Sequence, residues 1–295
     1  VGTVTTTDAD AGATFTYTLT GDDAASFEIT KTEGTQAGVL AFKAASAPDF
    51  ETKATYSLNV EVSDSSNTDS QAVVVNITNT NDNSPVFTSS TSESINEGET
   101  SVSTVVAGDD DVGDTIAYSI DSTGRGDHAL FAIDASTGAL TMTAPDFENP
   151  TDTFGTAGDN VYGVTVLATD SGTPANTATH DISVTVVNTN DNSPVFTSST
   201  SESINEGETS VSTVVAGDDD VGDTIAYSID STGRGDHALF AIDASTGALT
   251  MTAPDFENPT DTFGTAGDNV YGVTVLATDS GTPANTATHD ISVTV

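Results

Sequence analysis

The chain has 295 residues and carries 5 Lys and Arg against 45 Asp and Glu, a formal net charge of −40. This balance excludes a nucleic-acid binder, because there is no basic stripe to replace the counterions of phosphate, and it argues equally against contact with an anionic membrane. The sequence has no Cys, which excludes disulfides and thiolate metal sites. Repulsion among so many carboxylates opposes a compact fold unless cations bind between them.

The two ends of the chain fall inside segments with strand-like sequence. No apolar run reaches membrane-spanning length, and residues 1–20 lack the charged and apolar regions of a signal peptide. We therefore interpret the sequence as a stretch of a longer protein, with room for two or three domains.

An internal repeat organises the chain. Residues 79–186 and 188–295 are identical, and residues 1–78 are a divergent relative of the same unit. A repeat of this length is typical of tandem domains, whereas solenoids and propellers are built from shorter units. We predict three domains: 1–80, which lacks its first strand, 81–189, which is complete, and 190–295, which is identical to the second but lacks the C-terminal linker.

Apolar residues alternate with polar ones along the repeat. In chain order, the alternating segments are 116–120, 140–142, 162–168 and 182–186. Period-two alternation predicts half-buried β-strands, and turns rich in Gly and Asp separate them. No segment has the apolar stripe of a helix. Six or seven short strands per repeat indicate an all-β fold of tandem Ig-like, Greek-key β-sandwiches.

Acidic residues recur two positions apart. Asp109 pairs with Asp111, Asp146 pairs with Glu148, and the linker at 81–83 adds Asn-Asp-Asn. Residues i and i+2 of an extended chain point the same way, so each pair converges on one place. Clustered carboxylate and amide oxygens suit Ca²⁺, and the absence of His from these clusters argues against zinc or iron.

These motifs, in this order, resemble those of cadherin repeats. Residues 79–87 (NTNDNSPVF) and their copy at 188–196 resemble the cadherin linker Asp-x-Asn-Asp-Asn-x-Pro-x-Phe, with Asn in place of the first Asp. The further matches are Glu97-Gly98, Asp109-Asp-Asp111, Asp146-Phe-Glu148 (with Phe in place of Arg) and Ala168-Thr-Asp170-Ser-Gly172. The resemblance implies cadherin-like sandwiches joined end to end in a rod.

The resemblance also implies about three Ca²⁺ at each junction between repeats, held by the base of one repeat, the linker and the top of the next. For the second junction the implied ligands are Glu97, Asp146, Glu148, Asn190, Asp191, Asn192, Asp218, Asp220 and Asp279. For the first junction they are Asp49, Glu51, Asn81, Asp82, Asn83, Asp109, Asp111 and Asp170. We expect the first junction to bind more weakly, because its counterpart of Glu97 would lie before Val1.

Other motifs are weaker. Arg125-Gly-Asp127 and its copy at 234–236 spell an integrin-type tripeptide, which we interpret as a chance match. His180 and His289 begin the last strand of their repeats, and we expect both at the surface. Carboxylate pairs also occur in glycosidases, but the chain has no Trp to stack on a sugar.

We interpret the protein as a structural spacer and not as an enzyme: a stalk segment of a large, bacterial-type extracellular adhesin or filament. Identical tandem copies add length and rigidity, whereas recognition and catalysis gain little from duplication. The expected partners are adjacent repeats of the same chain. Two alternatives stay open, a module that binds itself or a glycan, and lateral assembly of identical chains into a sheath or fibre.

Overall fold

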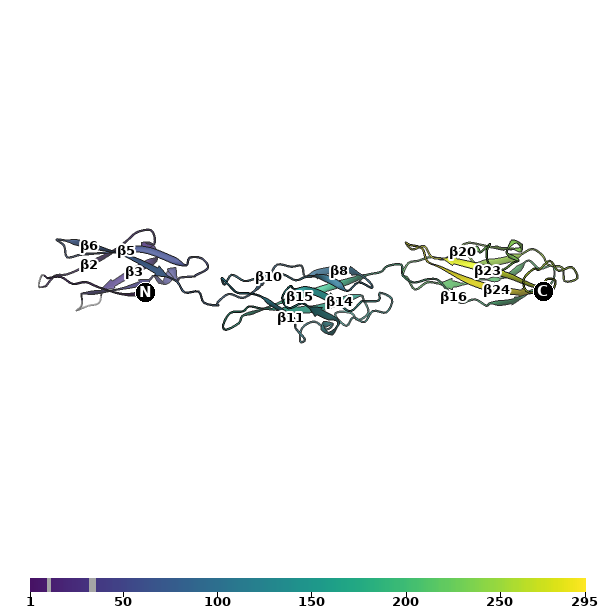
Figure 1. The fold of residues 1–295 in the computed structure, drawn as a ribbon, viewed down its shortest axis with the longest axis horizontal. Helices are drawn as coiled ribbons and strands as arrows, with labels where there is room; N and C mark the ends of the chain where they lie inside the picture. Colours follow the sequence, from purple (N-terminus) through teal and green to yellow (C-terminus); the bar gives the residue numbers. More distant parts are fainter. Residues whose placement is uncertain (10–11, 32–35) are drawn as a thin grey trace.

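The chain forms three groups of β-strands that follow one another along a line (Figure 1). The computed structural model describes residues 1–9, 12–31 and 36–295. Among them, the helices are four 3₁₀ turns: η1 (Ala24–Ser26), η2 (Ala44–Ser46), η3 (His128–Leu130) and η4 (His237–Leu239). No helix in this part of the chain is long and apolar enough to cross a membrane.

The first group is a sandwich of two antiparallel sheets with strand orders β1-β4-β3 and β2-β5-β6. Its core is small and centres on Phe27, Leu40 and Tyr56. The strands are β1 (Gly2–Thr5), β2 (Thr16–Thr20), β3 (Phe27–Lys31), β4 (Ala37–Phe42), β5 (Thr55–Ser63) and β6 (Thr68–Asn76).

The second group has sheets β11-β14-β15-β8 and β12-β13-β9, together with the pair β10-β7. Its strands are β7 (Val86–Phe87), β8 (Ser92–Asn96), β9 (Ser101–Thr104), β10 (Ala107–Gly108), β11 (Ala117–Ile120), β12 (Phe131–Ile133), β13 (Ala139–Met142), β14 (Val161–Thr169) and β15 (Thr177–Val187). The pairing is antiparallel except between β8 and β15, which run parallel from Ser92↔Ser183 to Asn96↔Val187.

The third group repeats this topology, with sheets β17-β24-β23-β20 and β18-β22-β21 and the pair β16-β19. Its strands are β16 (Val195–Phe196), β17 (Ser201–Ser203), β18 (Ser210–Thr213), β19 (Ala216–Gly217), β20 (Ala226–Ile229), β21 (Phe240–Ile242), β22 (Ala248–Met251), β23 (Val270–Thr278) and β24 (Thr286–Thr294).

The alternation seen in the sequence places the core. Val164, Val166 and Ala168 of β14 and Ile182 and Val184 of β15 are 0% exposed. Along β15 the neighbours of these residues are exposed or half-buried, as expected of a pleated strand with one buried face. Along β14, Gly163 and Thr165 are buried as well, because the segments that carry Phe154 and Arg125 cover the outer face. The predicted all-β fold of tandem Ig-like sandwiches is confirmed.

The edge of the sandwich differs from the expectation of six or seven strands, because two strands are each split. The first is split into β7, which pairs with β10, and β8, which pairs with β15. The second is split into β9, which pairs with β13, and β10. His180 packs beside this crossing, with its ring stacked 4.6 Å from that of Phe87 and its Nε2 3.0 Å from Ser90 O. The expectation that His180 lies at the surface was wrong: it is 9% exposed, because the crossing segment covers it.

A buried aspartate folds the loop between β13 and β14 back onto the sandwich. The Asp127 carboxylate, 3% exposed, accepts hydrogen bonds from Thr153 N (2.6 Å), Thr153 Oγ1 (2.8 Å), Gly163 N (2.9 Å) and Phe154 N (3.3 Å). Asp236 does the same in the third group, with Thr262, Phe263 and Gly272 as donors.

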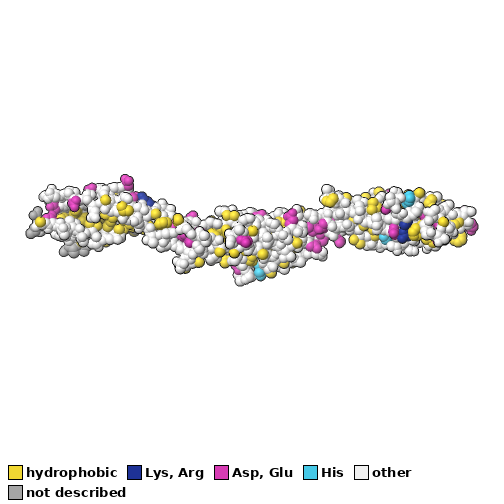
Figure 2. Space-filling model, viewed as in Figure 1, with side chains coloured by type: hydrophobic (Ala, Val, Ile, Leu, Met, Phe, Trp, Pro, Cys, Tyr) yellow, Lys and Arg dark blue, Asp and Glu magenta, His cyan; other side chains and the backbone are white. Residues whose placement is uncertain are grey.

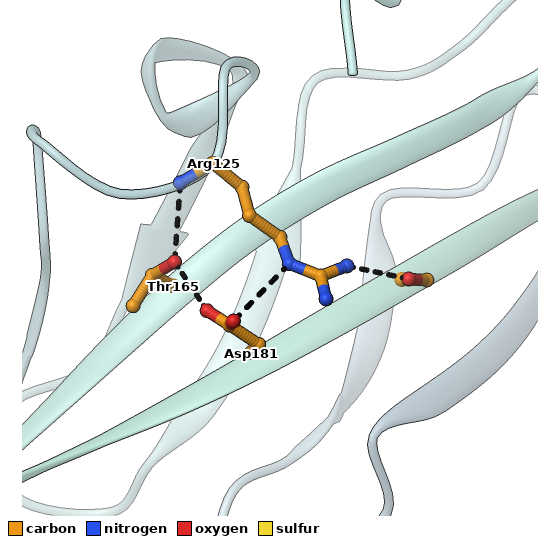
Figure 3. A network of polar contacts seen from close by, with 4 residues as sticks. Arg125, Thr165 and Asp181 are labelled. Carbon is orange, nitrogen blue, oxygen red and sulfur yellow. Dashed lines mark hydrogen bonds and ion pairs between the residues drawn. The ribbon is translucent and has the colours of Figure 1, made fainter. Parts of the chain in front are cut away.

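Arg125, two residues earlier, is also engaged (Figure 3). Its backbone N–H donates to Thr165 Oγ1 at 3.1 Å, and its Nε lies 3.6 Å from Asp181 Oδ2. The guanidinium also donates to Ser183 Oγ at 2.7 Å and lies 4.4 Å from the ring centroid of Phe154. Both charged side chains of the Arg-Gly-Asp tripeptide therefore hold the repeat together, and the tripeptide is not presented as a free loop motif.

This arrangement predicts an acid-sensitive contribution to stability. Burial raises the pKa of Asp236, but the hydrogen bonds from Gly272, Thr262 and Phe263 outweigh it and hold the pKa below its ordinary value. A carboxyl group whose pKa is lowered by folding stabilises the fold at any pH above its pKa in the unfolded chain, which is about 3.9. This contribution is lost as the pH falls through the pKa of the folded state.

We therefore expect the stability of the third repeat to fall more steeply between about pH 4 and pH 2 in the parent chain than in Asp236→Asn. The measurement is thermal unfolding in chelator across that range. Parallel pH profiles for the two proteins would contradict the assignment.

Candidate metal centre

Four carboxylates meet where the second and third groups join. One oxygen each of Glu97, Glu148, Asp191 and Asp220 lies within 4.8 Å of all the others. Glu97 follows β8, Glu148 follows β13, Asp191 lies in the linker after β15, and Asp220 follows β19. The cluster therefore draws on both neighbouring repeats and the linker. Figure 2 shows acidic side chains gathered at this join.

Glu97 ties the base of the second repeat to the linker. Its Oε1 accepts hydrogen bonds from Thr189 N (2.6 Å) and Thr189 Oγ1 (3.1 Å), and its Oε2 accepts one from Phe147 N (2.9 Å). The residue is only 7% exposed. These bonds fix the orientation of the carboxylate, and an oxygen that accepts backbone donors still has lone-pair capacity for a cation.

The linker is fixed on the third repeat. Asn192 N donates to Asp220 Oδ2 at 2.9 Å, and Asn190 Nδ2 donates to Asp279 Oδ1 at 3.1 Å. Asp218 accepts from Asp220 N at 3.0 Å, so the pair spaced two apart is folded back on itself. Of the residues that the sequence predicts at this junction, Asn190, Asn192, Asp218 and Asp279 are thus tied to the linker and the third repeat, and Asp146 lines the same hollow as Glu97, Glu148 and Asp191.

Several buried oxygens in this region have no hydrogen-bond partner among the described residues. They are Glu148 Oε1, Asn188 Oδ1, Asn190 Oδ1 and Asp218 Oδ2 at the second junction, and Glu51 Oε1, Asn79 Oδ1, Asn81 Oδ1 and Asp109 Oδ2 at the first. A buried acceptor without a partner is costly, so each needs a donor or a cation. All eight are carboxylate or amide oxygens, the atoms that Ca²⁺ prefers. The residues present therefore fit this ion.

The same crowding shifts the proton affinity of these groups. Burial and the charge of Glu97 raise the pKa of Glu148 to about 7. Burial, followed by Glu97, Asp220 and Asp146, raises the pKa of Asp191, and burial likewise raises that of Asp218. A raised carboxyl pKa means that the ionised form is destabilised here, as expected where like charges converge without a counterion.

Basic side chains do not relieve this repulsion. Within the described part of the chain, the ion pairs are Lys53 with Asp23, Arg125 with Asp181 and Arg234 with Asp290. None of these carboxylates belongs to a junction cluster. A cation from solution is the remaining means of neutralising the clusters.

The first junction repeats the arrangement with fewer carboxylates. Glu51, Asp82 and Asp111 each bring an oxygen within 4.8 Å of the others, where the second junction has four such groups. Asn83 N donates to Asp111 Oδ2 at 2.9 Å, and Asn81 Nδ2 donates to Asp170 Oδ1 at 3.1 Å. Asp49 accepts from Thr52, and its charge contributes to the raised pKa of Glu51 after burial, Asp111 and Asp82. Weaker binding at the first junction stays a prediction.

A third cluster shows what the junction adds. Glu206, Asp255 and Glu257 are the identical counterparts of Glu97, Asp146 and Glu148, and they also lie within 4.8 Å of one another. All three are exposed, whereas Glu97 is buried. Thr189 N and Thr189 Oγ1 both donate to Glu97 Oε1, so the linker takes part in burying Glu97.

Sequence reasoning missed several residues of the region. Asp223 joins Asp218 and Asp220 in a group within 4.8 Å. Asn176 and Asn285 contact the linker backbone, each six residues after the aspartate that begins its loop. The spacing of Asn176 and Asn285 carries no signal of its own, because the two repeats are identical and their linker contacts join segments 93 residues apart.

The cadherin-domain family model matches residues 91–187 and 200–295, and the chain belongs to the cadherin family. Among curated proteins it is similar to the protocadherin-like wing polarity protein stan of Drosophila melanogaster, with 32% identity over 99% of this chain and 8% of that protein. It is also similar to the human cadherin EGF LAG seven-pass G-type receptor 3, with 34% identity over 68% of this chain and 6% of the receptor.

Solved structures agree on the fold. Mouse cadherin-23 EC22-24 matches with a TM-score of 0.65 and 26% identity, over 98% of this chain and 88% of that one. The protocadherin gammaB7 EC3-6 cis-dimer structure matches with a TM-score of 0.70 and 22% identity, over 95% of this chain and 67% of that one. The chain spans less than a tenth of the curated relatives it matches.

Proposed function

We propose that this segment is a calcium-stiffened spacer in an extracellular adhesion protein. The observation that supports it most directly is the meeting of Glu97, Glu148, Asp191 and Asp220 within 4.8 Å, from two repeats and the linker between them. Because these groups repel one another and form no ion pair with a basic side chain among the described residues, the alignment of the two repeats depends on a cation. Bound Ca²⁺ would supply the positive charge that neutralises them.

The residues have distinct tasks in this proposal. Glu97, Asp146 and Glu148 face the junction from the upstream repeat, and Asp218, Asp220 and Asp279 face it from the downstream repeat. Asn190, Asp191 and Asn192 would complete the oxygen shell from the linker. At the first junction the oxygen ligands would come from Asp49, Glu51, Asn81, Asp82, Asn83, Asp109, Asp111 and Asp170. About three ions per junction is the number implied by the family resemblance.

The extracellular setting and the lack of catalysis are parts of the same proposal. Related structures are described as extracellular cadherin domains, which supports a site outside the cell for this chain as well. The pairs Asp146 with Glu148 and Asp218 with Asp220 lie where two repeats meet, which supports a role in joining repeats and not that of an enzyme. The two identical tandem copies and the −40 charge favour a stalk of a bacterial-type surface adhesin. Lateral assembly of identical chains stays an alternative to this proposal.

Small-angle X-ray scattering tests the spacer. With millimolar calcium we expect a long, stiff particle whose three repeats lie in line. In chelator we expect a broader distribution of shapes with a smaller mean radius of gyration, because repulsion among the clustered carboxylates destabilises the aligned arrangement and the junctions bend. Magnesium at the same ionic strength is the matched control, since it takes fewer ligands in a stricter geometry.

The outcome that contradicts the proposal is scattering that stays the same in calcium, magnesium and chelator. Circular dichroism in the same buffers shows whether the individual sandwiches remain folded. A loss of β-signal in chelator would mean that the metal supports the repeats themselves and not only their alignment.

A further inference from the structure

Asn285 holds the backbone of the linker. Its side-chain Nδ2 donates to two linker carbonyls, Asn192 O at 2.7 Å and Asn190 O at 3.1 Å. Its own backbone N–H donates to Asp279 Oδ2 at 2.9 Å. One side chain therefore bridges the carbonyls on either side of Asp191, the carboxylate that the linker contributes to the cluster.

The other contacts of the linker with the third repeat reinforce this hold. Asn190 Nδ2 donates to Asp279 Oδ1 and to Pro283 O, and Asn192 N donates to Asp220 Oδ2. A Cβ added at Gly281 would lie 2.1 to 2.5 Å from the Asn190 side-chain amide, so the linker sits flush against this loop. Every one of these partners belongs to the downstream repeat.

The first junction contains the same arrangement beside a different upstream repeat. Asn176 Nδ2 donates to Asn83 O at 2.6 Å and to Asn81 O at 3.4 Å, and Gly172 makes room for Asn81 as Gly281 does for Asn190. Residues 1–78 differ in sequence from the second repeat, yet the linker keeps these bonds. The hold is thus a property of the linker and the repeat that follows it.

We propose that Asn285 and Asn176 are positioning residues that fix each linker on the downstream repeat without metal, so that half of the calcium site is assembled in advance. On the upstream side the linker is held through Thr189 and Glu97 and by a longer bond of 3.4 Å from Asn192 Nδ2 to Glu148 Oε2. Bending in the absence of calcium therefore occurs between the upstream repeat and the linker. The inference rests on the proposed calcium-dependent junction.

The test compares the parent chain with Asn285→Ala and Asn285→Asp. Both variants lose the amide donors and keep the backbone N–H. If the side chain positions the linker, both weaken calcium binding at the second junction, by about tenfold for the alanine variant. If only charge matters, the aspartate variant binds calcium more tightly. Asn176→Ala is the matched control, because it alters the first junction and leaves the second unchanged.

Hydrogen exchange read by mass spectrometry locates the effect in the full chain. The linkers at 79–87 and 188–196 are identical, so peptides that begin at or before residue 187 are needed to tell the second from the first. In chelator, Asn285→Ala should raise exchange at the Asn192 amide several-fold. Peptides that span residue 285 differ in mass from those of the second repeat in both Asn285→Ala and Asn176→Ala, and their β24 amides should exchange at the same rate in the two variants. Calcium titration of the same peptides gives the affinity of each junction.

Each outcome is decisive for one hypothesis. Unchanged linker exchange and unchanged calcium affinity in Asn285→Ala, with a parent chain that binds calcium, would overturn the positioning role alone. A parent chain whose linker exchange does not respond to calcium would overturn the proposed function, while faster exchange of Asn285→Ala in chelator would still support the metal-free hold on the linker.

Discussion

Replacing Asp236 with Ala is expected to destabilise the third repeat by about 3 kcal/mol, because the backbone N–H groups of Thr262, Phe263 and Gly272 lose their acceptor at once. The carboxylate is 3% exposed, so water replaces it poorly. Chemical denaturation followed by hydrogen exchange should show the third repeat unfolding first, with the second repeat, which keeps Asp127, unaffected.

Asp243→Ala is the matched control for this variant. Asp243 also accepts several bonds, from Ser245 N, Thr246 N and Thr246 Oγ1, but it caps an exposed turn. We expect a loss of only about 1 kcal/mol there, since solvent satisfies the freed donors. Equal losses in the two variants would show that the burial of Asp236 adds nothing to its contribution to stability.

Glu97→Ala is expected to remove most of the calcium-dependent alignment at the second junction. The change deletes one of four clustered carboxylates and also the acceptor for Thr189 N and Phe147 N, which connects the upstream repeat to the linker. We expect the calcium concentration for half-saturation of this junction to rise by about tenfold or more. Isothermal titration calorimetry and scattering on the full chain measure the two effects.

The identical residue of the third repeat gives the control. Glu206 has the same sequence around it but is exposed, and its hydrogen bond from Phe256 N is long at 3.3 Å. Glu206→Ala should leave both junctions unchanged. If the two variants lost the same amount of calcium binding, acidic residues would be attracting cations diffusely, wherever they lie, and the cluster geometry would be irrelevant.

The sequence predicted the fold where local pattern decides it. Alternation identified the inward faces of β13, β14 and β15, because a strand with one buried face has to place every second residue in the core. It also predicted that Asp218 and Asp220 converge, and they do, but through a bend in which Asp220 N donates to Asp218 Oδ1 and not through an extended strand. The linker motif then indicated that both sets belong to one junction.

What the sequence did not reveal depends on contacts between distant segments. The splitting of the edge into β7 and β8 follows from pairing with β10 and β15, which no local pattern encodes. The burial of Asp127 depends on a loop 26 residues away along the chain. The role of Asn285 depends on a linker 93 residues earlier, whose backbone conformation creates the need for a donor.

The parallel pairing of β8 with β15 has a mechanical consequence. β8 is reached soon after the linker that enters the second repeat, and β15 runs directly into the linker that leaves it. Tension applied along the row of repeats therefore pulls these two strands in opposite directions along their length. All the backbone hydrogen bonds from Ser92↔Ser183 to Asn96↔Val187 are then loaded together in shear, and none can open first as in a peeled hairpin. A repeat built this way resists stretching at the strands that carry the load from one linker to the next.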